Sequence, residues 1–203
     1  MGMPPFIVTL ALMIIIDGVI LAYTLGYPIY IDFPSSFVFF GQGYIGKIPV
    51  SVIIMIAVFI FGYIFLNHLK IGRYFFAFGG NKEAARLSGI NTKLIGISSF
   101  ILGSAIATIA GIVLTAKLAA GLPNAGGLTL TLDAYTATIL GGTSLAGGKG
   151  TIYGAIIGVL LIGVINNGLI LYGIPYYFQN IVKGLIILMA VAWNSIRTVR
   201  SVR

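Results

Sequence analysis

The run GGTSLAGGKGT at residues 141–151 contains the residue types of a phosphate-binding loop. Such loops have the spacing G-x-x-x-x-G-K-[ST], because backbone N–H groups hold the phosphates while lysine and a hydroxyl residue reach their ends. If Gly148 and Lys149 are the G-K pair, the first glycine of the pattern falls on Thr143 and the hydroxyl residue falls on Gly150. A nucleotide-binding loop follows a buried strand, whereas this run follows a long apolar segment. We therefore interpret the run as a turn or hinge and exclude nucleotide binding.

Other kinds of catalysis have few candidate residues. His68 is the only histidine and cysteine is absent, so the usual zinc ligand sets cannot be assembled. The same inventory offers no Ser-His-Asp set inside the apolar part of the chain. Asp17 and Asp133 are the acids expected at or near membrane depth, where ionisable residues are functional candidates. An intramembrane enzyme that uses these two carboxylates is a remote alternative, and we expect no enzyme, no metal and no cofactor.

Apolar elements must position these residues. The chain of 203 residues is 59% apolar and 8% charged, whereas a soluble domain carries about 25% charged residues. This composition suits lipid as the solvent, so the sequence predicts an all-α, polytopic membrane helix bundle. We expect about six transmembrane segments, at residues 6–22, 50–66, 94–115, 128–140, 151–172 and 177–193. The fourth is short for a crossing, which takes about 20 residues, and is expected to be tilted or broken.

The net charge of +8 arises mainly from two short intervals. Their basic residues are Lys70, Arg73, Lys82, Arg86 and Lys93, followed by Arg197, Arg200 and Arg203. Basic residues gather in the cytoplasmic loops of membrane proteins, and six alternating crossings place both intervals on one side. We therefore expect both termini in the cytoplasm and no nucleic-acid partner. The outer connection, residues 23–49, is expected to form an aromatic belt at the headgroups, with a contact surface for an external partner as the alternative.

The cytoplasmic loop at residues 69–94 is expected to contain a short helix of its own. Asn81 is a good N-cap for this helix, and Gly89 supplies a left-handed stop. Glu83 in the first turn and Arg86 in the last turn complement the helix dipole. The sequence therefore predicts a self-contained helix of two turns that lies outside the membrane.

The pair Gly79-Gly80 is expected to break the chain just before this helix. A short rigid helix bounded by glycines can fit a groove on another protein. It can then transmit motion between a soluble protein that drives the movement and the membrane bundle. The alternative is a solvated amphipathic helix that rests on lipid headgroups. Because Leu87 and Ile90 are its only large apolar residues, burial in the headgroups would be weak.

Small and polar residues inside the apolar segments are candidates for two roles. Small residues at helical spacing are expected to pack helices closely, with a pore lining as the alternative. They are Gly103, Ala107, Gly111, Gly150, Gly154 and Gly158. The candidates for a translocation path are Asp17, Asp133, Thr143, Ser144, Asn166 and Asn167. An amide deep in a segment needs a partner, so hydrogen bonding between helices is the alternative role for the two asparagines.

Two long motifs carry a resemblance to a known family. They are IGRYFFAFGGNKEAARLSGIN at residues 71–91 and LDAYTATILGGTSLAGGKGTIYGAIIGVLLIGVINNGL at residues 132–169. In this order and spacing, they resemble the permease subunit of bacterial ATP-binding cassette importers for ribose and related monosaccharides. The resemblance extends from MPPFIVTLALM to VKGLIILMAVAW and so covers nearly the whole chain. Permeases for branched-chain amino acids resemble this family in the glycine-rich segment and are the alternative.

The resemblance implies a single transmembrane permease domain over residues 1–203, located in the bacterial plasma (inner) membrane. It implies that the chain forms a homodimer, receives sugar from an extracytoplasmic sugar-binding protein, and binds a cytoplasmic ATP-binding subunit that hydrolyses the ATP. The residues implied in binding that subunit are Gly80, Asn81, Glu83, Ala84, Ala85, Arg86, Leu87, Ser88 and Gly89. Since permeases of this family begin with several further helices, the chain is expected to be the C-terminal part of one.

Overall fold

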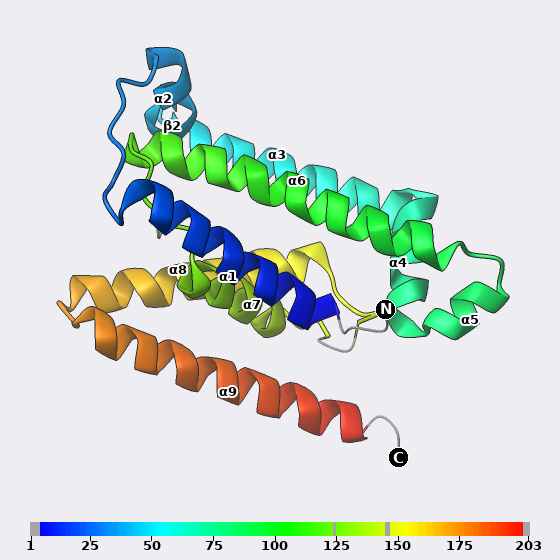
Figure 1. Cartoon of the computed structure of the whole chain (residues 1–203). Helices are drawn as coiled ribbons and strands as arrows, with labels where there is room; N and C mark the ends of the chain where they lie inside the picture. The colour runs from blue at the N-terminus through cyan, green and yellow to red at the C-terminus, as the bar shows by residue number, and fades with distance from the viewer. Residues whose placement is uncertain (1–4, 124, 145–146, 201–203) are drawn as a thin grey trace. The chain divides into compact units, whose positions relative to one another are not determined.

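The computed structural model describes residues 5–123, 125–144 and 147–200, and they form helices joined by short connections (Figure 1). The helices are α1 (Pro5–Thr24), α2 (Ser35–Gln42), α3 (Val50–His68), α4 (Lys70–Gly80), α5 (Lys82–Leu87), α6 (Thr92–Leu118), α7 (Leu128–Leu140), α8 (Ile152–Leu171) and α9 (Tyr176–Arg200). Two strands, β1 (Tyr44–Ile45) and β2 (Ile48–Pro49), pair antiparallel as a hairpin. Each of the six predicted apolar segments is a helix, which confirms the all-α prediction.

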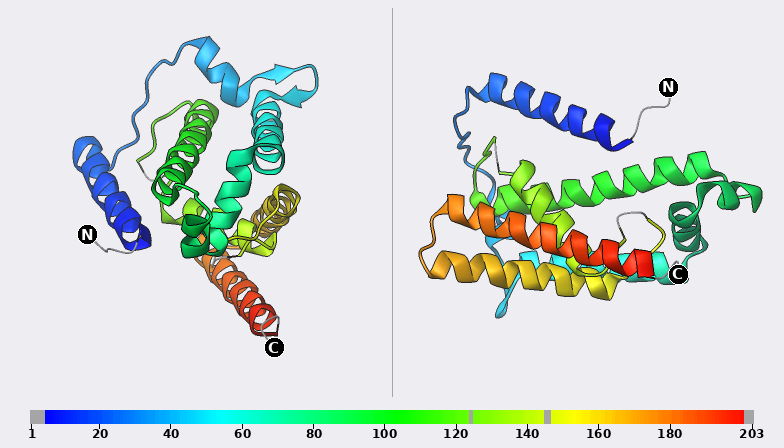
Figure 2. Two further views of the ribbon diagram at one scale, coloured as in Figure 1. Left: turned by 90° about the vertical axis from the view of Figure 1, so that its right-hand side faces the viewer. Right: turned by 90° about the horizontal axis from the view of Figure 1, so that it is seen from below.

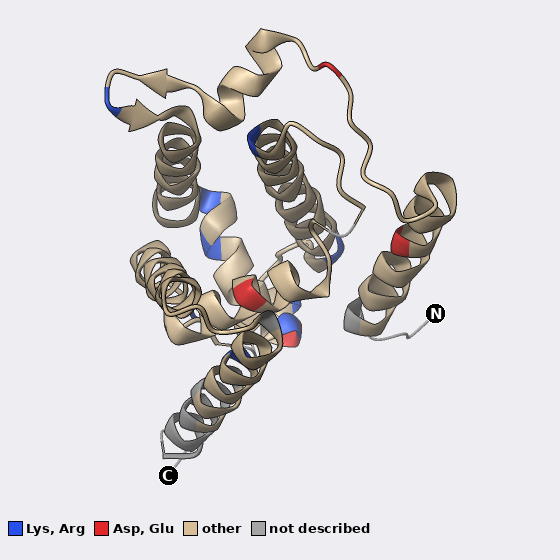
Figure 3. Cartoon of the chain, turned by 90° about the vertical axis from the view of Figure 1, so that its left-hand side faces the viewer, with Lys and Arg blue, Asp and Glu red and all other residues tan. Residues whose placement is uncertain are grey.

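Four helices are long and apolar enough to cross a membrane, namely α1 from Ile7 to Thr24, α3, α6 and α8. Neither α3 nor α8 contains a lysine, arginine, aspartate or glutamate, and the ribbon carries few coloured charges along the long helices (Figure 3). Their large apolar side chains are mostly exposed, as expected where lipid is the solvent. Helices satisfy every backbone hydrogen bond internally, which lipid requires. The chain is therefore a polytopic membrane helix bundle, as predicted.

The described chain separates into two compact units. The first consists of Met1–Ile56 and Ala105–Leu130, and the second consists of Ala57–Ser104 and Thr131–Arg203. Helices α3 and α6 each contribute residues to both units.

In the first unit, the connection between α1 and α3 folds against the C-terminal end of α6. Ile29 and Gly121 form an antiparallel bridge, with N–H to O=C distances of 2.9 and 2.8 Å. Gln42 at the end of α2 donates from Nε2 to the carbonyl of Lys117 at 3.0 Å, and satisfies one acceptor of the last turn of α6. Figure 2 shows the hairpin as two short arrows that lead into α3. The connection is thus an ordered element of the fold, and the aromatic belt expected there stays a prediction.

In the second unit, α4 turns back onto the end of α3. Gly72 is buried against the backbone of Phe65 and Leu66, and the rings of Phe65 and Phe75 lie 5.7 Å apart. The predicted break at Gly79-Gly80 is wrong, because both glycines belong to the last turn of α4. Glycine weakens a helix by about 1 kcal/mol relative to alanine. Here both glycines remain helical in a turn that lies against another backbone segment.

Helices α7 and α8 pack against each other through their backbones. Gly154 meets the carbonyl of Gly141, and Gly158 meets the carbonyl of Ala137. The later residue of α8, Gly158, contacts the earlier residue, Ala137, so the two helices run antiparallel. The side chain of Thr151 caps α8 by accepting from the N–H of Gly154 at 3.1 Å. The loop that joins α7 and α8 extends toward α4 (Figure 1).

Candidate functional site

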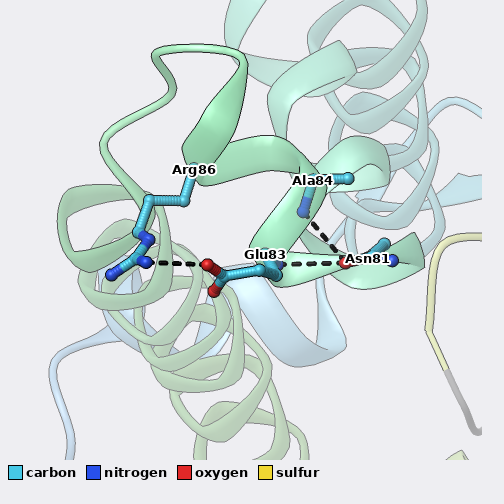
Figure 4. Close-up of polar contacts among 4 residues, drawn as sticks. All are labelled: Asn81, Glu83, Ala84 and Arg86. Carbon is cyan, nitrogen blue, oxygen red and sulfur yellow. Dashed lines mark hydrogen bonds and ion pairs between the residues drawn. The ribbon is translucent and has the colours of Figure 1, made fainter.

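Helix α5 begins at a cap that the sequence predicted. Asn81 has an extended backbone, with φ −157° and ψ 104°, and its Oδ1 accepts from the N–H groups of Glu83 and Ala84, both at 3.0 Å (Figure 4). The N–H of Asn81 also donates to the carbonyl of Ala77 at 3.1 Å. Asn81 therefore ends α4 and begins α5, and no other residue lies between these two helices.

The far end of α5 is closed by a left-handed glycine. Gly89 has φ +82°, and its N–H donates to the carbonyl of Arg86 at 3.0 Å. The N–H of Ile90 reaches the carbonyl of Ala85 at 3.1 Å, which completes the bond pattern of a Schellman motif. The predicted cap and stop are confirmed, and the helix has six residues, slightly less than the two turns predicted.

One face of α5 is anchored and the other is open. Ala85 is 4% exposed and Leu87 is 79% exposed. Arg86 Nη2 lies 2.7 Å from Glu83 Oε1 (Figure 4), and both side chains are about two-thirds exposed. An exposed pair of this kind contributes at most about 1 kcal/mol to stability. The open face therefore presents a leucine beside one charge of each sign, a composition suited to a partner protein.

A second group of polar side chains lies within the apolar helices, and we call it the polar cluster. Lys183 on α9 donates from Nζ to Asp133 Oδ2 on α7 at 2.8 Å. Asn166 on α8 donates from Nδ2 to the same oxygen at 3.2 Å. The side chains of Lys183 and Asp133 are 14% and 19% exposed. Three helices therefore meet at one carboxylate, whose charge the ammonium group neutralises.

The polar cluster retains one free acceptor among the described residues. Asn166 Oδ1 is buried and has no hydrogen-bond partner there, although buried polar atoms nearly always have one. Asp133 and Asn166 also lie at the same distance from the ends of their helices. Asp133 is five residues from the start of α7, and Asn166 is five residues from the end of α8. At 1.5 Å per residue, each lies about 8 Å along its helix from the end that they share.

The remaining path candidates lie elsewhere. Asp17 lies on α1 and forms no ion pair with any residue in the described ranges. Thr143 and Ser144 follow α7 in the loop, whereas Asp133 lies seven residues before the end of that helix, about 10 Å at 1.5 Å per residue. Asn167 is exposed, where its neighbour in sequence is half-buried.

Sequence reasoning missed Lys183. The available signal was a lysine seven residues inside α9, since a charge within an apolar segment requires a partner.

The small residues proposed for helix packing have different surroundings. A Cβ on Gly103 or Gly111 would have no other heavy atom within 4 Å among the described residues, and Ala107 is exposed. A Cβ on Gly150 would lie 3.1 Å from the side chain of Thr143, and Gly154 and Gly158 form the backbone contacts of α8 described above. His68 contacts Tyr63 edge-on, at 5.5 Å between ring centroids. Within the described ranges, no three His, Cys, Asp or Glu side chains converge as metal ligands.

Known proteins are similar to the chain over most of its length. The family model described as "Branched-chain amino acid transport system / permease component" matches residues 1–191. The ribose import permease protein of Escherichia coli (strain K12) is 46% identical over 189 residues, which are 92% of this chain and 59% of that protein.

Two further relatives extend this likeness. The ribose import permease protein of Bacillus subtilis (strain 168) is 43% identical over 190 residues, 93% of this chain and 59% of that protein. The xylose transport system permease protein of Escherichia coli (strain K12) is 39% identical over 154 residues, 76% of this chain and 39% of that protein. The chain thus spans less than two thirds of the length of these relatives, and no solved structure matches it significantly.

Proposed function

The chain belongs to the family of permease components of the branched-chain amino acid transport system type, and from this premise we propose that it forms transmembrane helices of an ATP-binding cassette importer for ribose or a related monosaccharide. The observation that carries this proposal is the likeness to permeases named for ribose in two different bacteria. The family description names branched-chain amino acids, but these relatives and the xylose permease favour a sugar.

The proposed partner on the cytoplasmic side is an ATP-binding subunit that docks on α5. Support comes from the rigid caps at both ends of α5 and from its open face with Leu87, Glu83 and Arg86. The chain itself carries no nucleotide-binding loop pattern, so ATP hydrolysis is assigned to that subunit. An extracytoplasmic sugar-binding protein and a second copy of the permease complete the proposed assembly.

The proposed translocation path passes the polar cluster. A monosaccharide is neutral and rich in hydroxyl groups, so a path for it needs hydrogen-bonding groups without net charge. Lys183 and Asp133 cancel each other's charge, and Asn166 Oδ1 has the free acceptor that a sugar hydroxyl can meet. An amino acid, which carries two charges, would compete with this ion pair for its partners.

The orientation that suits this assembly has both termini and α5 in the cytoplasm of a bacterial cell. The exposed lysines and arginines of the loop at residues 69–94 support this side. The hairpin then faces outward, where the sugar-binding protein delivers its ligand.

Transport assays on the assembled system test the proposal. The chain is produced with the ATP-binding subunit and sugar-binding protein of its own organism, together with any further part of its permease, and reconstituted in liposomes. We expect uptake of radiolabelled ribose, and ATP hydrolysis stimulated by the binding protein loaded with ribose. Uptake of leucine in place of ribose would assign the chain to amino-acid transport, and absence of an associating ATP-binding subunit would contradict the proposal as a whole.

The docking site is tested separately by Leu87→Asp. Because this side chain is 79% exposed, the substitution is expected to leave the fold intact while it weakens co-purification of the ATP-binding subunit. Lys47→Ala in the hairpin is the matched control, since that residue is exposed and lies far along the chain. Unchanged co-purification with Leu87→Asp would place the docking site elsewhere.

A further inference from the structure

The glycines in the last turn of α4 approach the backbone of the loop between α7 and α8. A Cβ on Gly79 would lie 2.6 Å from the N of Gly148, and a Cβ on Gly147 would lie 2.7 Å from the O of Gly79. A Cβ on Gly148 would lie 2.5 Å from the Cα of Gly80. Real Cβ atoms essentially never approach so closely. We call these four residues the glycine contact, and three of its four members leave no room for a side chain.

On one side, the glycine contact is continuous with the α7–α8 pair. The loop is closed by a hydrogen bond from the N–H of Ser144 to the carbonyl of Lys149 at 2.9 Å. The two helices that it joins meet backbone to backbone, at Gly141 with Gly154 and at Ala137 with Gly158. Close-packed backbones transmit displacement because no side-chain rotation can absorb it. A shift of the loop therefore shifts α7 and α8 together.

On the other side, the glycine contact is adjacent to α5. Gly80 is followed by Asn81, which ends α4 and caps α5 through hydrogen bonds of 3.1 and 3.0 Å. Only Asn81 and the last turn of α4 therefore lie between α5 and the α7–α8 loop, with no flexible linker.

We propose that the glycine contact transmits the displacement of α5 to the α7–α8 pair, and through it to the polar cluster at Asp133 and Asn166. Gly79, Gly147 and Gly148 are positioning residues, since they act through the helices that they join. The inference rests on the proposed function, because it requires an ATP-binding subunit that moves α5.

Neighbouring glycines of α4 provide a matched test. Gly79→Ala places a methyl group 2.6 Å from the backbone nitrogen of Gly148, whereas Gly80→Ala places one 4.0 Å from the Cα of Gly148, in ordinary contact. Both substitutions lie in the same turn and raise helix propensity equally. In the reconstituted complex, we expect Gly79→Ala to keep basal ATP hydrolysis and co-purification but to lose at least about fivefold of ribose-stimulated hydrolysis and uptake, the lower end of usual coupling between sites. Gly80→Ala is expected to behave as the wild type.

A second pair of variants separates the contact from backbone strain. Gly147 has φ +89° and Gly142 has φ +84°, so alanine is strained equally at both. Gly147→Ala also meets the backbone of Gly79, whereas a Cβ on Gly142 would have nothing within 4 Å. We expect coupling to fall in the first variant alone.

A cross-link tests the same inference without a clash. The chain has no cysteine, so Gly80→Cys with Lys149→Cys can be joined by a short bifunctional maleimide across the contact. If the contact moves as one body, the linked complex keeps its ribose-stimulated hydrolysis. Loss of stimulation on linking, or full coupling in Gly79→Ala, would overturn the inference. If the unmodified wild-type complex shows no stimulation, the proposed function fails instead, and the two failures are therefore distinguishable.

Discussion

Lys183 on α9 and Asp133 on α7 form an ion pair, 2.8 Å between Nζ and Oδ2, within helices that are otherwise largely apolar. The two residues are 50 positions apart, so the pair fixes α9 against α7 at one register. Asn166 adds α8 to the same point. Since polar groups in lipid have no water to bind, this cluster specifies how the three helices meet.

Removal of one member of this pair is predicted to destabilise the fold. Lys183→Met leaves the carboxylate of Asp133 with one donor, and should cost about 2–3 kcal/mol, below the range for a fully buried pair because both side chains are partly exposed. The double variant Lys183→Met with Asp133→Asn should recover part of this loss, since no charge is left unpaired. Unfolding in mixed micelles measures both. The exposed Glu83→Gln serves as the control, with an expected change below about 1 kcal/mol, and a double variant no more stable than the single would contradict the pairing.

The Asn81 cap is predicted to control the order of α5, the proposed docking helix. Asn81→Ala removes the acceptor for two N–H groups and should cost about 1 kcal/mol of local helix stability. Asn81→Asp should retain the cap. The measurement is amide hydrogen exchange at residues 82–87, which should be faster in Asn81→Ala. The affinity of that variant for the proposed ATP-binding subunit should be lower as well. Asn91→Ala is the matched control, because Asn91 Oδ1 accepts from Leu94 N–H at 3.1 Å and caps α6. Faster exchange of α5 in the control would refute the local assignment.

The packing of α7 on α8 is predicted to exclude a methyl group at one glycine and accept it at another. A Cβ on Gly158 would overlap the carbonyl of Ala137, whereas a Cβ on Gly163 has nothing within 4 Å among the described residues. Gly158→Ala should therefore destabilise the protein by about 1–3 kcal/mol through overpacking. Gly163→Ala should be neutral or slightly stabilising, because alanine favours the helix. Thermal unfolding in detergent compares the two, and equal midpoints would show that the close contact is not maintained.

The side of the membrane that each loop faces is predicted to follow the basic residues. Single cysteines can be introduced into this cysteine-free chain at Lys47, Lys93 and Lys149. An impermeant maleimide added to intact cells should label Lys47→Cys at once. Lys93→Cys and Lys149→Cys should react only after the membrane is opened. Labelling of all three from one side would overturn the proposed order of crossings.

The long apolar elements could be predicted from composition, because a segment that lies in lipid must be helical along its whole length. The predicted fourth segment coincides with α7, from Leu128 to Leu140, and the predicted Asn81 cap is the observed one. These features depend on neighbours within a few residues, which a single sequence displays.

Features that depend on distant contacts could not be predicted. The pairing of Lys183 with Asp133 joins segments 50 residues apart. Helix propensity does not predict that Gly79 and Gly80 are helical, because their turn is packed on the α7–α8 loop. Helix α2 and the hairpin were missed for the same reason. The bond from Gln42 to Lys117 that holds α2 to α6 spans 75 residues.

The single residue between α4 and α5 limits how α5 can move. A peptide bond is planar, so one residue supplies two rotatable backbone angles. At Asn81, the cap bonds that Oδ1 accepts from Glu83 and Ala84 hold ψ. A change of ψ at Asn81 breaks those bonds, whereas a rotation about φ turns α5 and its cap together and leaves the bond to Ala77 intact. The joint therefore has one restricted backbone angle, and α5 turns about the N–Cα bond of Asn81 together with its cap as one body.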